Sequence, residues 1–278
     1  MSHLVIDETY EGFLVYTMHR MGTNRTFYIL QINGIEHSTL EINIPQEKID
    51  YLISIRFSNT NLIRLPDLSQ FNYLSSLSVV NNPYLIDILP EPILNTDTDD
   101  LSHLPIALQN SLRWYTPRLP TNLSELLIDN NPSLTSLPKI PMLQELIIVN
   151  NNNLTTLPDA IRYYMDPEHP MLQLTCANNN LTTLPNLSRF TKLKQLNCAY
   201  NILQSLPVLP NSVNSLVISI DQIGILINDN NTPTEALTSL NPEATIVIRD
   251  LIYFPDGQEK KIYIQILISF SSLIMILN

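Results

Sequence analysis

The chain has 278 residues, 44% of them hydrophobic, and a formal net charge of -11 at pH 7. This apolar content is enough for a substantial core, so a disordered chain is excluded. The negative charge, with no compensating cluster of Lys and Arg, excludes nucleic acids as expected partners and makes anionic membrane surfaces unfavourable.

The first part of the chain, residues 1–48, is predicted to form an antiparallel β-meander that caps one end of the fold. The segments "GFLVYTM", "RTFYILQI" and "IEHSTLEINI" have the composition of strands. They are separated by "HRMGTN" and by Asn33-Gly34, and Asn-Gly is the strongest short hairpin signal. The beginning of the chain is acidic where a secretory signal is basic and then apolar, so a cytoplasmic location is expected.

Residues 49–225 repeat the pattern L-x-x-L-x-L-x-x-N-x-L-x-x-L-P, sometimes with one extra residue after the Asn. Full copies begin at Leu52, Leu74, Leu123, Leu143, Leu172 and Leu193, and a partial copy begins at Val213. The second Leu and the residue two positions later lie on the same side of a short strand. One unit cannot bury this apolar side alone, so successive units are expected to stack as a parallel ladder.

Two further positions of the repeat have predictable roles. The Asn after each strand is expected to turn its amide inward and satisfy backbone groups where the chain leaves the ladder. This position holds Asn82, Asn131, Asn151, Asn179 and Asn201, with Thr60 and Asp221 in its place at the two ends. The Pro after the last Leu favours an extended or 3-10 return segment over a long helix.

Two insertions interrupt the repeats. Between Pro90 and Ser124 the pattern degrades, although a strand around Leu112 to Trp114 is expected to join the ladder. The acidic segment "NTDTDD" within it is interpreted as a solvated loop rather than a calcium site, because no twelve-residue ligand pattern follows. The second insertion, from Asp159 to Met171, is expected to add a helical turn.

The last part of the chain, residues 226–278, is predicted to form a β-hairpin cap. The segments "TIVIRDLIYF" and "KKIYIQILISF" flank the turn signature "PDGQEK". Residues 262–278 are also apolar and uncharged, so a membrane anchor is the alternative interpretation of this tail. The tail is shorter than the ~20 residues that span a bilayer, and its alternation of Ile with other residues favours a strand.

The repeat pattern resembles that of leucine-rich repeat proteins. Its L-P-x-L-P and N-N-x-L-T-x-L-P motifs, spaced by 20 to 22 residues, are most similar to the short repeats of bacterial effector proteins. The resemblance implies an α/β-type leucine-rich repeat solenoid of about seven to eight repeats, mostly β, with an extended or 3-10 convex side. It also implies a curved parallel β-sheet, few helices and antiparallel β caps. The abundance of Asn and Ile is typical of AT-rich genomes such as those of giant viruses, amoebae or intracellular bacteria, for which a host cytoplasm is a further expected location.

No group of residues in the sequence has the spacing of an enzyme site. The five histidines are scattered, and five glycines against 20 prolines disfavour phosphate-binding loops. Cys176 and Cys198 take the inward position of neighbouring repeats and are predicted to be buried, reduced thiols. Some effectors with similar repeats carry a ubiquitin ligase domain with a catalytic Cys beyond them, but no Cys follows Asp221 here. No cofactor, metal or small-molecule substrate is expected.

The outward positions of the strands are expected to form a concave binding face. One column reads Arg56, Ser78, Arg113, Leu127, Ile147, Thr175, Asn197 and Val217, and the next reads Ser58, Val80, Tyr115, Asp129, Val149, Ala177, Ala199 and Ser219. An apolar centre with a charged border is typical of a protein interface. The candidate partner-binding residues are Arg113, Tyr115, Glu125, Leu127, Asp129, Glu145, Ile147, Val149 and Tyr200.

The functional hypothesis is therefore a non-enzymatic protein-protein interaction module. The alternative function is a membrane-tethered scaffold anchored by the C-terminal tail. A structural alternative for the face itself is that Leu127 and Ile147 are strand-forming residues that no partner covers.

Overall fold

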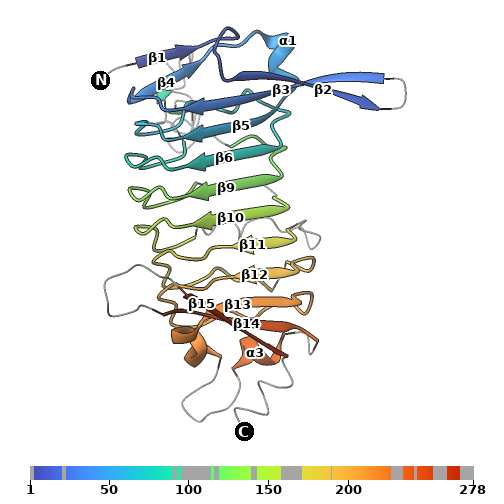
Figure 1. Cartoon of the computed structure of the whole chain (residues 1–278), viewed down its shortest axis with the longest axis vertical. Coiled ribbons are helices and arrows are strands. Elements are labelled where there is room, and N and C mark those ends of the chain that lie inside the picture. The colour runs from blue at the N-terminus through green and yellow to red at the C-terminus, as the bar shows by residue number, and fades with distance from the viewer. Residues whose placement is uncertain are drawn as a thin grey trace, which may run out of the picture.

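The computed structural model places the repeats in one long sheet (Figure 1). It describes residues 3–20, 23–89, 93–94, 114–115, 119–138, 143–157, 171–188, 190–226, 234–240, 243–252 and 262–269. The sheet has 11 strands in the order β15-β14-β13-β12-β11-β10-β9-β6-β5-β3-β2, and neighbours from β3 to β14 run parallel. Its strands are β2 (Phe13–Arg20), β3 (Thr23–Asn33), β5 (Leu52–Ser58), β6 (Ser76–Val80), β9 (Glu125–Asp129), β10 (Glu145–Val149), β11 (Gln173–Thr175), β12 (Gln195–Asn197), β13 (Ser215–Ser219), β14 (Thr245–Ile252) and β15 (Ile262–Ser269).

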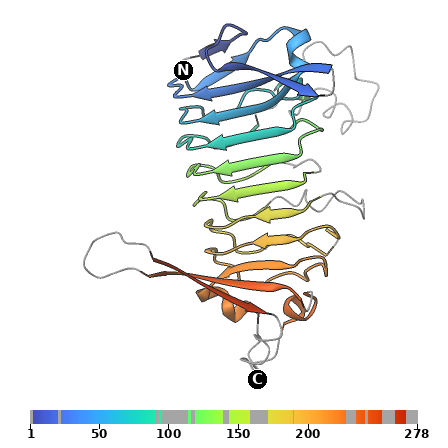
Figure 2. The same ribbon diagram turned by 45° about the vertical axis from the view of Figure 1, so that its right-hand side comes forward.

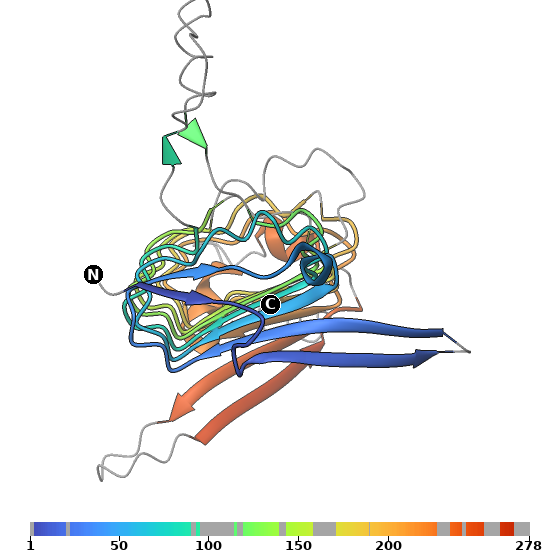
Figure 3. The same ribbon diagram turned by 90° about the horizontal axis from the view of Figure 1, so that it is seen from above.

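One row of leucines runs along the inner side of this sheet, as the repeat spacing predicts. Leu126, Leu146, Leu174 and Leu196 are paired in register from β9 to β12, and none is more than 1% exposed. Seen along the stack, the turns of the chain superimpose around this core (Figure 3). Each turn thus buries its apolar side against the turns beside it.

A row of buried asparagines follows the strands and links the turns, which confirms their predicted inward orientation. Asn82, Asn131, Asn151, Asn179 and Asn201 are each at most 4% exposed. The amide Nδ2 of Asn151 donates to the carbonyl oxygens of Val149 (2.7 Å) and Ile128 (3.2 Å). Its Oδ1 accepts from the backbone N–H of Asn131 at 3.0 Å. The buried backbone groups at the end of each strand are therefore satisfied by side chains.

The two ends of this asparagine row are closed by other residues. Thr60 is buried and donates from its backbone N–H (3.0 Å) and its Oγ1 (2.7 Å) to Oδ1 of Asn82, as expected. At the other end the prediction for Asp221 is wrong, because Asp221 is exposed. The 3-10 helix η2 (Ile220–Ile225) turns Gln222 inward instead, and its Nε2 donates to the Cys198 carbonyl at 3.2 Å.

Strands in the repeats end at a residue with left-handed backbone geometry. Gly34 has a φ of 68°, and the residues with positive φ that are not glycine are Asn59, Asn81, Asn130, Asn150, Asn178 and Tyr200. Gly and Asn tolerate this conformation better than other residues. The residue one position before each buried asparagine thus has a conformational role of its own, and it is an asparagine in every case except Tyr200.

At the N-terminal end, one of the two predicted hairpins is present. β2 and β3 pair antiparallel, but the chain does not fold back at Asn33-Gly34. Instead β3 pairs parallel with β5, and β4 (Thr39–Ile42) pairs parallel with β1 (His3–Ile6) in a separate sheet. The antiparallel arrangement predicted after Gly34 is therefore wrong. The left-handed conformation of Gly34, which also favours hairpins, here leads the chain out of the ladder.

At the C-terminal end, β14 and β15 form the predicted antiparallel hairpin, which projects from the stack (Figure 2). The first part of the apolar tail, Ile262–Ser269, is therefore a strand, and residues 270–278 lie outside the described residues. The helices are short: α1 (Gln46–Ile49) precedes β5, and α3 (Glu235–Thr238) precedes β14. No helix in the described ranges has the length and apolar character needed to cross a membrane.

The strand predicted near Leu112 to Trp114 does not join the ladder. β6 pairs directly with β9, so Ser78 lies opposite Leu127. The short strand β8 (Trp114–Tyr115) pairs antiparallel with β7 (Ile93–Leu94) in a sheet of its own. The acidic loop at 95–100 and the insertion at 159–170 lie outside the described residues.

Candidate functional site

The outward side of the stack, here called the outer face, carries three rows of side chains that alternate with the buried inner rows. The first row is Ile29, Ser54, Ser76, Glu125, Glu145, Gln173, Gln195 and Ser215; the second is Gln31, Arg56, Ser78, Leu127, Ile147, Thr175, Asn197 and Val217; the third, shorter row is Asn33, Ser58, Val80, Asp129 and Val149. The first expected column is thus correct except for Arg113. The second is correct only in part, because Tyr115 does not join this sheet and Val80, Ala199 and Ser219 are buried.

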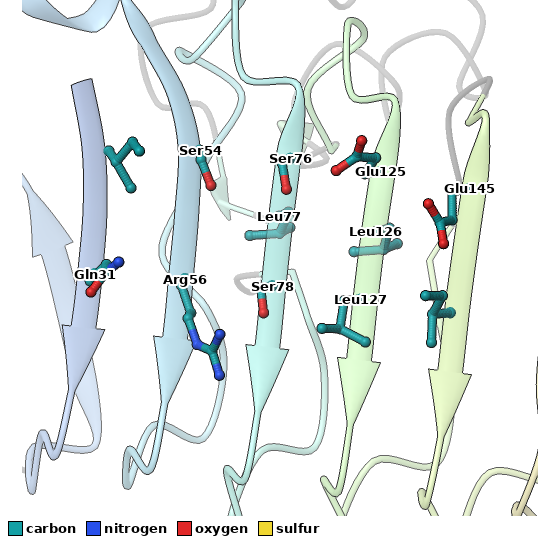
Figure 4. A pocket seen from close by; sticks show the side chains of 12 residues that line it. Gln31, Ser54, Arg56, Ser76, Leu77, Ser78, Glu125, Leu126, Leu127 and Glu145 are labelled. Atoms are coloured by element: carbon teal, nitrogen blue, oxygen red, sulfur yellow. The ribbon is translucent and has the colours of Figure 1, made fainter. Parts of the chain in front are cut away.

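A shallow hollow of about 400 Å³ lies on this face between β3 and β10 (Figure 4). Its centre is formed by Ser54, Ser76 and Ser78, whose short side chains leave space between the longer residues on either side. The hydroxyl Oγ of Ser78 is itself buried and has no hydrogen-bond partner among the described residues. This serine therefore contributes the shape of the hollow rather than an exposed hydroxyl.

The charged groups of the hollow lie on opposite sides of β6, which carries Ser76 and Ser78. Glu125 on β9 and Glu145 on β10 are direct neighbours in the strand register, and Arg56 lies on β5. None of these three side chains forms an ion pair with another described residue. Like charges on directly opposed positions of a sheet are destabilising, so the glutamate pair has a cost that the fold itself does not require.

The apolar part of the hollow lies beside the glutamates. Leu127 and Ile147 are also neighbours in the register, and both are half-buried. Figure 4 shows Leu127 on the same side of the sheet as Arg56 and Ser78. The hollow thus combines two apolar side chains, two carboxylates and one guanidinium on a fixed backbone.

The structure brings together four of the nine predicted site residues in this hollow: Glu125, Leu127, Glu145 and Ile147. Asp129 and Val149 lie on the same strands in the third row and do not line it. Asp129 also has a structural bond, because its Oδ1 accepts from Asn150 Nδ2 at 2.6 Å.

The other three predicted residues lie elsewhere. Tyr200 is half-buried in the turn after β12, with a φ of 57° and its backbone N–H bonded to Ser219 Oγ at 3.0 Å. Tyr115 belongs to β8, outside the main sheet, and Arg113 lies outside the described residues. Arg113 and Tyr115 were expected in the outer columns because a strand around Leu112 to Trp114 was expected to join the ladder. The direct pairing of β6 with β9 leaves no place for this strand.

Sequence reasoning missed the contribution of Arg56 and the serines to this site. Arg56 appears in the predicted column, but an intervening strand would have placed it one strand farther from Glu125. The available signal was the serine pair Ser54 and Ser76 at equivalent positions of consecutive repeats, with a third serine, Ser78, on the same strand as Ser76. Small side chains on an otherwise bulky sheet indicate a depression.

The two thiols are buried neighbours on the inner side, as predicted, and they form no disulfide. Burial raises the pKa of the Cys198 thiol to about 12. Burial also raises the pKa of Cys176 well above its ordinary value, and the adjacent Cys198 adds to the effect. Thiols with raised pKa values are poor nucleophiles at neutral pH. Among the described residues, no three or more His, Cys, Asp or Glu side chains are grouped as metal ligands.

The parallel sheet, the inner leucine row and the few short helices are consistent with a leucine-rich repeat-like fold. No family model matches the chain, and no curated protein matches it. Among solved structures, the chain is similar to the leucine-rich repeat domain of the type III effector XopL, with 20% sequence identity and a TM-score of 0.38. This similarity covers 68% of this chain and 76% of the other.

Proposed function

We propose that this protein is a non-enzymatic interaction module, a leucine-rich repeat solenoid that binds a protein partner on the concave side of its sheet. The binding site is the hollow of the outer face between β3 and β10. The observation that carries the proposal is the juxtaposition of Glu125 and Glu145 beside Leu127 and Ile147. A monomer gains nothing from exposing neighbouring like charges next to apolar side chains, whereas an interface uses both.

The composition of the outer face supports this location. On β11 and β12 the first two rows hold only the uncharged polar residues Gln173, Thr175, Gln195 and Asn197. The charged and large apolar groups on β9 and β10 are therefore bordered by uncharged polar residues on this side. Binding energy in protein interfaces is concentrated in the same way, in a small cluster surrounded by near-neutral contacts.

The partner chemistry follows from the charges. A Lys or Arg side chain over Glu125 and Glu145 relieves the repulsion between the two carboxylates. An apolar side chain beside it covers Leu127 and Ile147, at roughly 25 cal/mol for each Å² of apolar surface removed from water. Because the strand register holds all of these groups on a rigid backbone, little ordering of this surface is needed on binding.

The test is affinity purification from the native cell with a fourfold variant. Glu125→Lys and Glu145→Lys reverse the charges, and Leu127→Asp and Ile147→Asp remove the apolar surface. We expect the variant to lose a specifically co-purifying protein by at least about tenfold, because several contacts of about 1 kcal/mol or more are removed together. The melting temperature should stay near that of the wild type, since all four side chains face outward.

A matched control carries the same changes on the neighbouring strands. Gln173→Lys, Gln195→Lys, Thr175→Asp and Asn197→Asp occupy the same two rows on β11 and β12. The control should retain the partner. Equal recovery with the wild type and the hollow variant would contradict the proposed function, and so would equal loss with both variants.

A further inference from the structure

A second hollow lies at the edge where the strands begin, and no function has been assigned to it so far. It has a volume of about 790 Å³, and its lining includes Tyr28, Tyr51, Tyr73, Glu47 and Asp50. We refer to these five residues as the tyrosine groove. It lies where α1 approaches the β2–β3 hairpin as this hairpin leaves the stack (Figure 1).

The aromatic side chains of the groove are aligned by the ladder. The backbone N–H of Tyr28 donates to the Tyr51 carbonyl at 2.9 Å. Tyr51 and Tyr73 hold the same position in consecutive turns, since Ser54 pairs with Ser76 and Ser75 N donates to Ile53 O at 2.9 Å. Neighbouring parallel strands lie ~4.8 Å apart, so the tyrosines start from backbone positions one strand spacing apart.

The ring of Tyr28 is held by a stacking contact, whereas Tyr51 and Tyr73 are open to solvent. Tyr28 stacks on Phe13, with the ring centroids 5.1 Å apart and an interplanar angle of 14°. The side chains of Tyr51 and Tyr73 are 53% and 58% exposed. A bulge lies at the base, because Ile53 is inserted between the partners of Tyr28 and Ile29. Bulges redirect side chains and often lie beside functional sites.

The charge of the groove is negative. Glu47 lies in the first turn of α1 and Asp50 at its end, and both are exposed. One oxygen of Asp50 accepts from Gln46 Nε2 at 3.1 Å, which leaves its second oxygen as a further acceptor. The cation nearest to them on α1, Lys48, forms an ion pair with Glu8. The charge of Lys48 also interacts with Glu47, although the ion pair of this lysine within the described residues is with Glu8 and not with Glu47 or Asp50.

We propose that the tyrosine groove binds an arginine side chain of a partner protein, independently of the outer face. A guanidinium is planar and weakly hydrated, stacks on aromatic rings, and donates several N–H groups to carboxylates. An anionic ligand is repelled by Glu47 and Asp50. A purely apolar ligand would cover these carboxylates without giving them a partner.

A lysine ammonium fits the groove less well, because it is more strongly hydrated and cannot stack. A trimethylated ammonium suits aromatic rings but has no N–H to donate to Glu47 or Asp50. The combination of exposed rings and acceptor oxygens therefore selects the guanidinium.

The test is an NMR titration of the full chain with N-acetyl-arginine methylamide, and with the corresponding lysine, trimethyllysine and norleucine compounds. We expect the arginine probe to shift the amide signals of Tyr51, Ile53 and Tyr73, with a Kd on the order of 1 mM. The Tyr51→Ala/Tyr73→Ala double variant should bind at least tenfold more weakly. The Glu47→Gln/Asp50→Asn variant should lose the preference for arginine over norleucine.

Tyr84→Ala is the matched control, since Tyr84 is similarly exposed at 59% but does not line the groove. It should leave the titration unchanged. The proposal is overturned if the arginine probe shifts no groove signal at about 20 mM, well above the expected Kd. It is also overturned if trimethyllysine binds more tightly than arginine, or if Tyr84→Ala weakens binding as much as the double variant. None of these outcomes depends on the hollow of the outer face.

Discussion

At the scale of single residues, Asn151 shows how one amide holds three turns together. Its Nδ2 donates to Val149 in its own turn and to Ile128 in the turn before, and its Oδ1 accepts from Asn131 N. Its backbone N–H donates at 2.9 Å to Oδ1 of Asn179 in the next turn. Removing the side chain therefore leaves buried backbone groups on two turns without partners.

We expect Asn151→Ala to lower the free energy of unfolding by about 2–4 kcal/mol, because each buried polar group left unsatisfied costs roughly 1–3 kcal/mol. Urea denaturation followed by circular dichroism measures the change. Asn153→Ala, an exposed position in the same turn, is the control and should stay within about 0.5 kcal/mol of the wild type. An unchanged midpoint for Asn151→Ala would show that water replaces the amide.

The buried thiols give a second prediction at this scale, on alkaline stability. In the unfolded chain a cysteine has a pKa of about 8.5, and in the folded chain burial raises the pKa of Cys198 to about 12. The folded state therefore favours the protonated thiol. The stability that this preference gives to the folded state is complete below the thiol pKa of the unfolded chain. It is lost as pH rises toward the thiol pKa of the folded chain.

Between pH 9 and pH 11 we expect the free energy of unfolding to fall by up to ~1.4 kcal/mol per pH unit for each of Cys176 and Cys198. Comparing the wild type with the Cys176→Ala/Cys198→Ala variant by denaturation at each pH isolates the thiols from other titrating groups. The difference in free energy between the two proteins should shrink as pH rises. A constant difference would contradict the assignment of raised pKa values to these thiols.

At the scale of elements, each strand has one structural side and one side available for contacts. On β11, Leu174 is fully buried in the inner row and Thr175 is half-buried on the outer face. Neighbouring residues of one strand thus differ in what a substitution removes. The alternation continues from β10 to β12 because these parallel neighbours keep the same register.

We expect Leu174→Ala to destabilise the protein by about 2–5 kcal/mol, because it leaves a cavity in a packed core. Thr175→Ala on the same strand should cost less than about 1 kcal/mol, since it removes only surface contacts. Thermal or urea unfolding of the two variants gives the comparison. Equal effects would mean that the two faces of the sheet are not distinguished as the structure shows.

At the scale of the whole molecule, the outer-face hollow and the tyrosine groove lie at different parts of one rigid ladder. The hollow involves the strands from β3 to β10, and the groove involves the middle of β3 and the edge where β5 and β6 begin. The net charge of -11 favours basic partners at both. The two sites adjoin on β3 and β5, because Ile29 and Ser54 line the hollow and Tyr28 and Ile53 line the groove. The hollow residues to be substituted lie on β9 and β10 and do not line the groove, and substitutions without shared partners normally act additively.

The fourfold variant of the hollow should therefore leave the Kd of the arginine probe within about twofold of the wild type, which corresponds to less than ~0.5 kcal/mol of coupling. The reverse experiment uses Tyr51→Ala/Tyr73→Ala in the affinity purification, where a partner held only by the hollow is retained. Both proteins are measured under the same salt conditions, because screening weakens charged contacts. Loss of probe binding in the hollow variant would contradict the independence of the two sites.

Periodic features of this protein could be derived from its sequence. Leucines at fixed spacing can be buried only against the next copy of the repeat, which determines the inner row containing Leu146 and Leu174. The same spacing determines the asparagine row and the burial of Cys176 and Cys198. Four residues of the hollow followed from this frame, because alternation along a strand is a local property.

Only the tertiary structure decided which segments are neighbours where the pattern is interrupted. The residues between Pro90 and Ser124 retain parts of the repeat, and the pairing of β6 with β9 excludes them from the ladder and brings Arg56 and Ser78 toward Glu125. Gly34 has the same left-handed preference in a hairpin and in a turn that leaves a ladder, so local conformation cannot distinguish the two. The physical reason is that backbone propensity is set by each residue and its neighbours, whereas strand partners are chosen by the burial and hydrogen bonding of the whole stack.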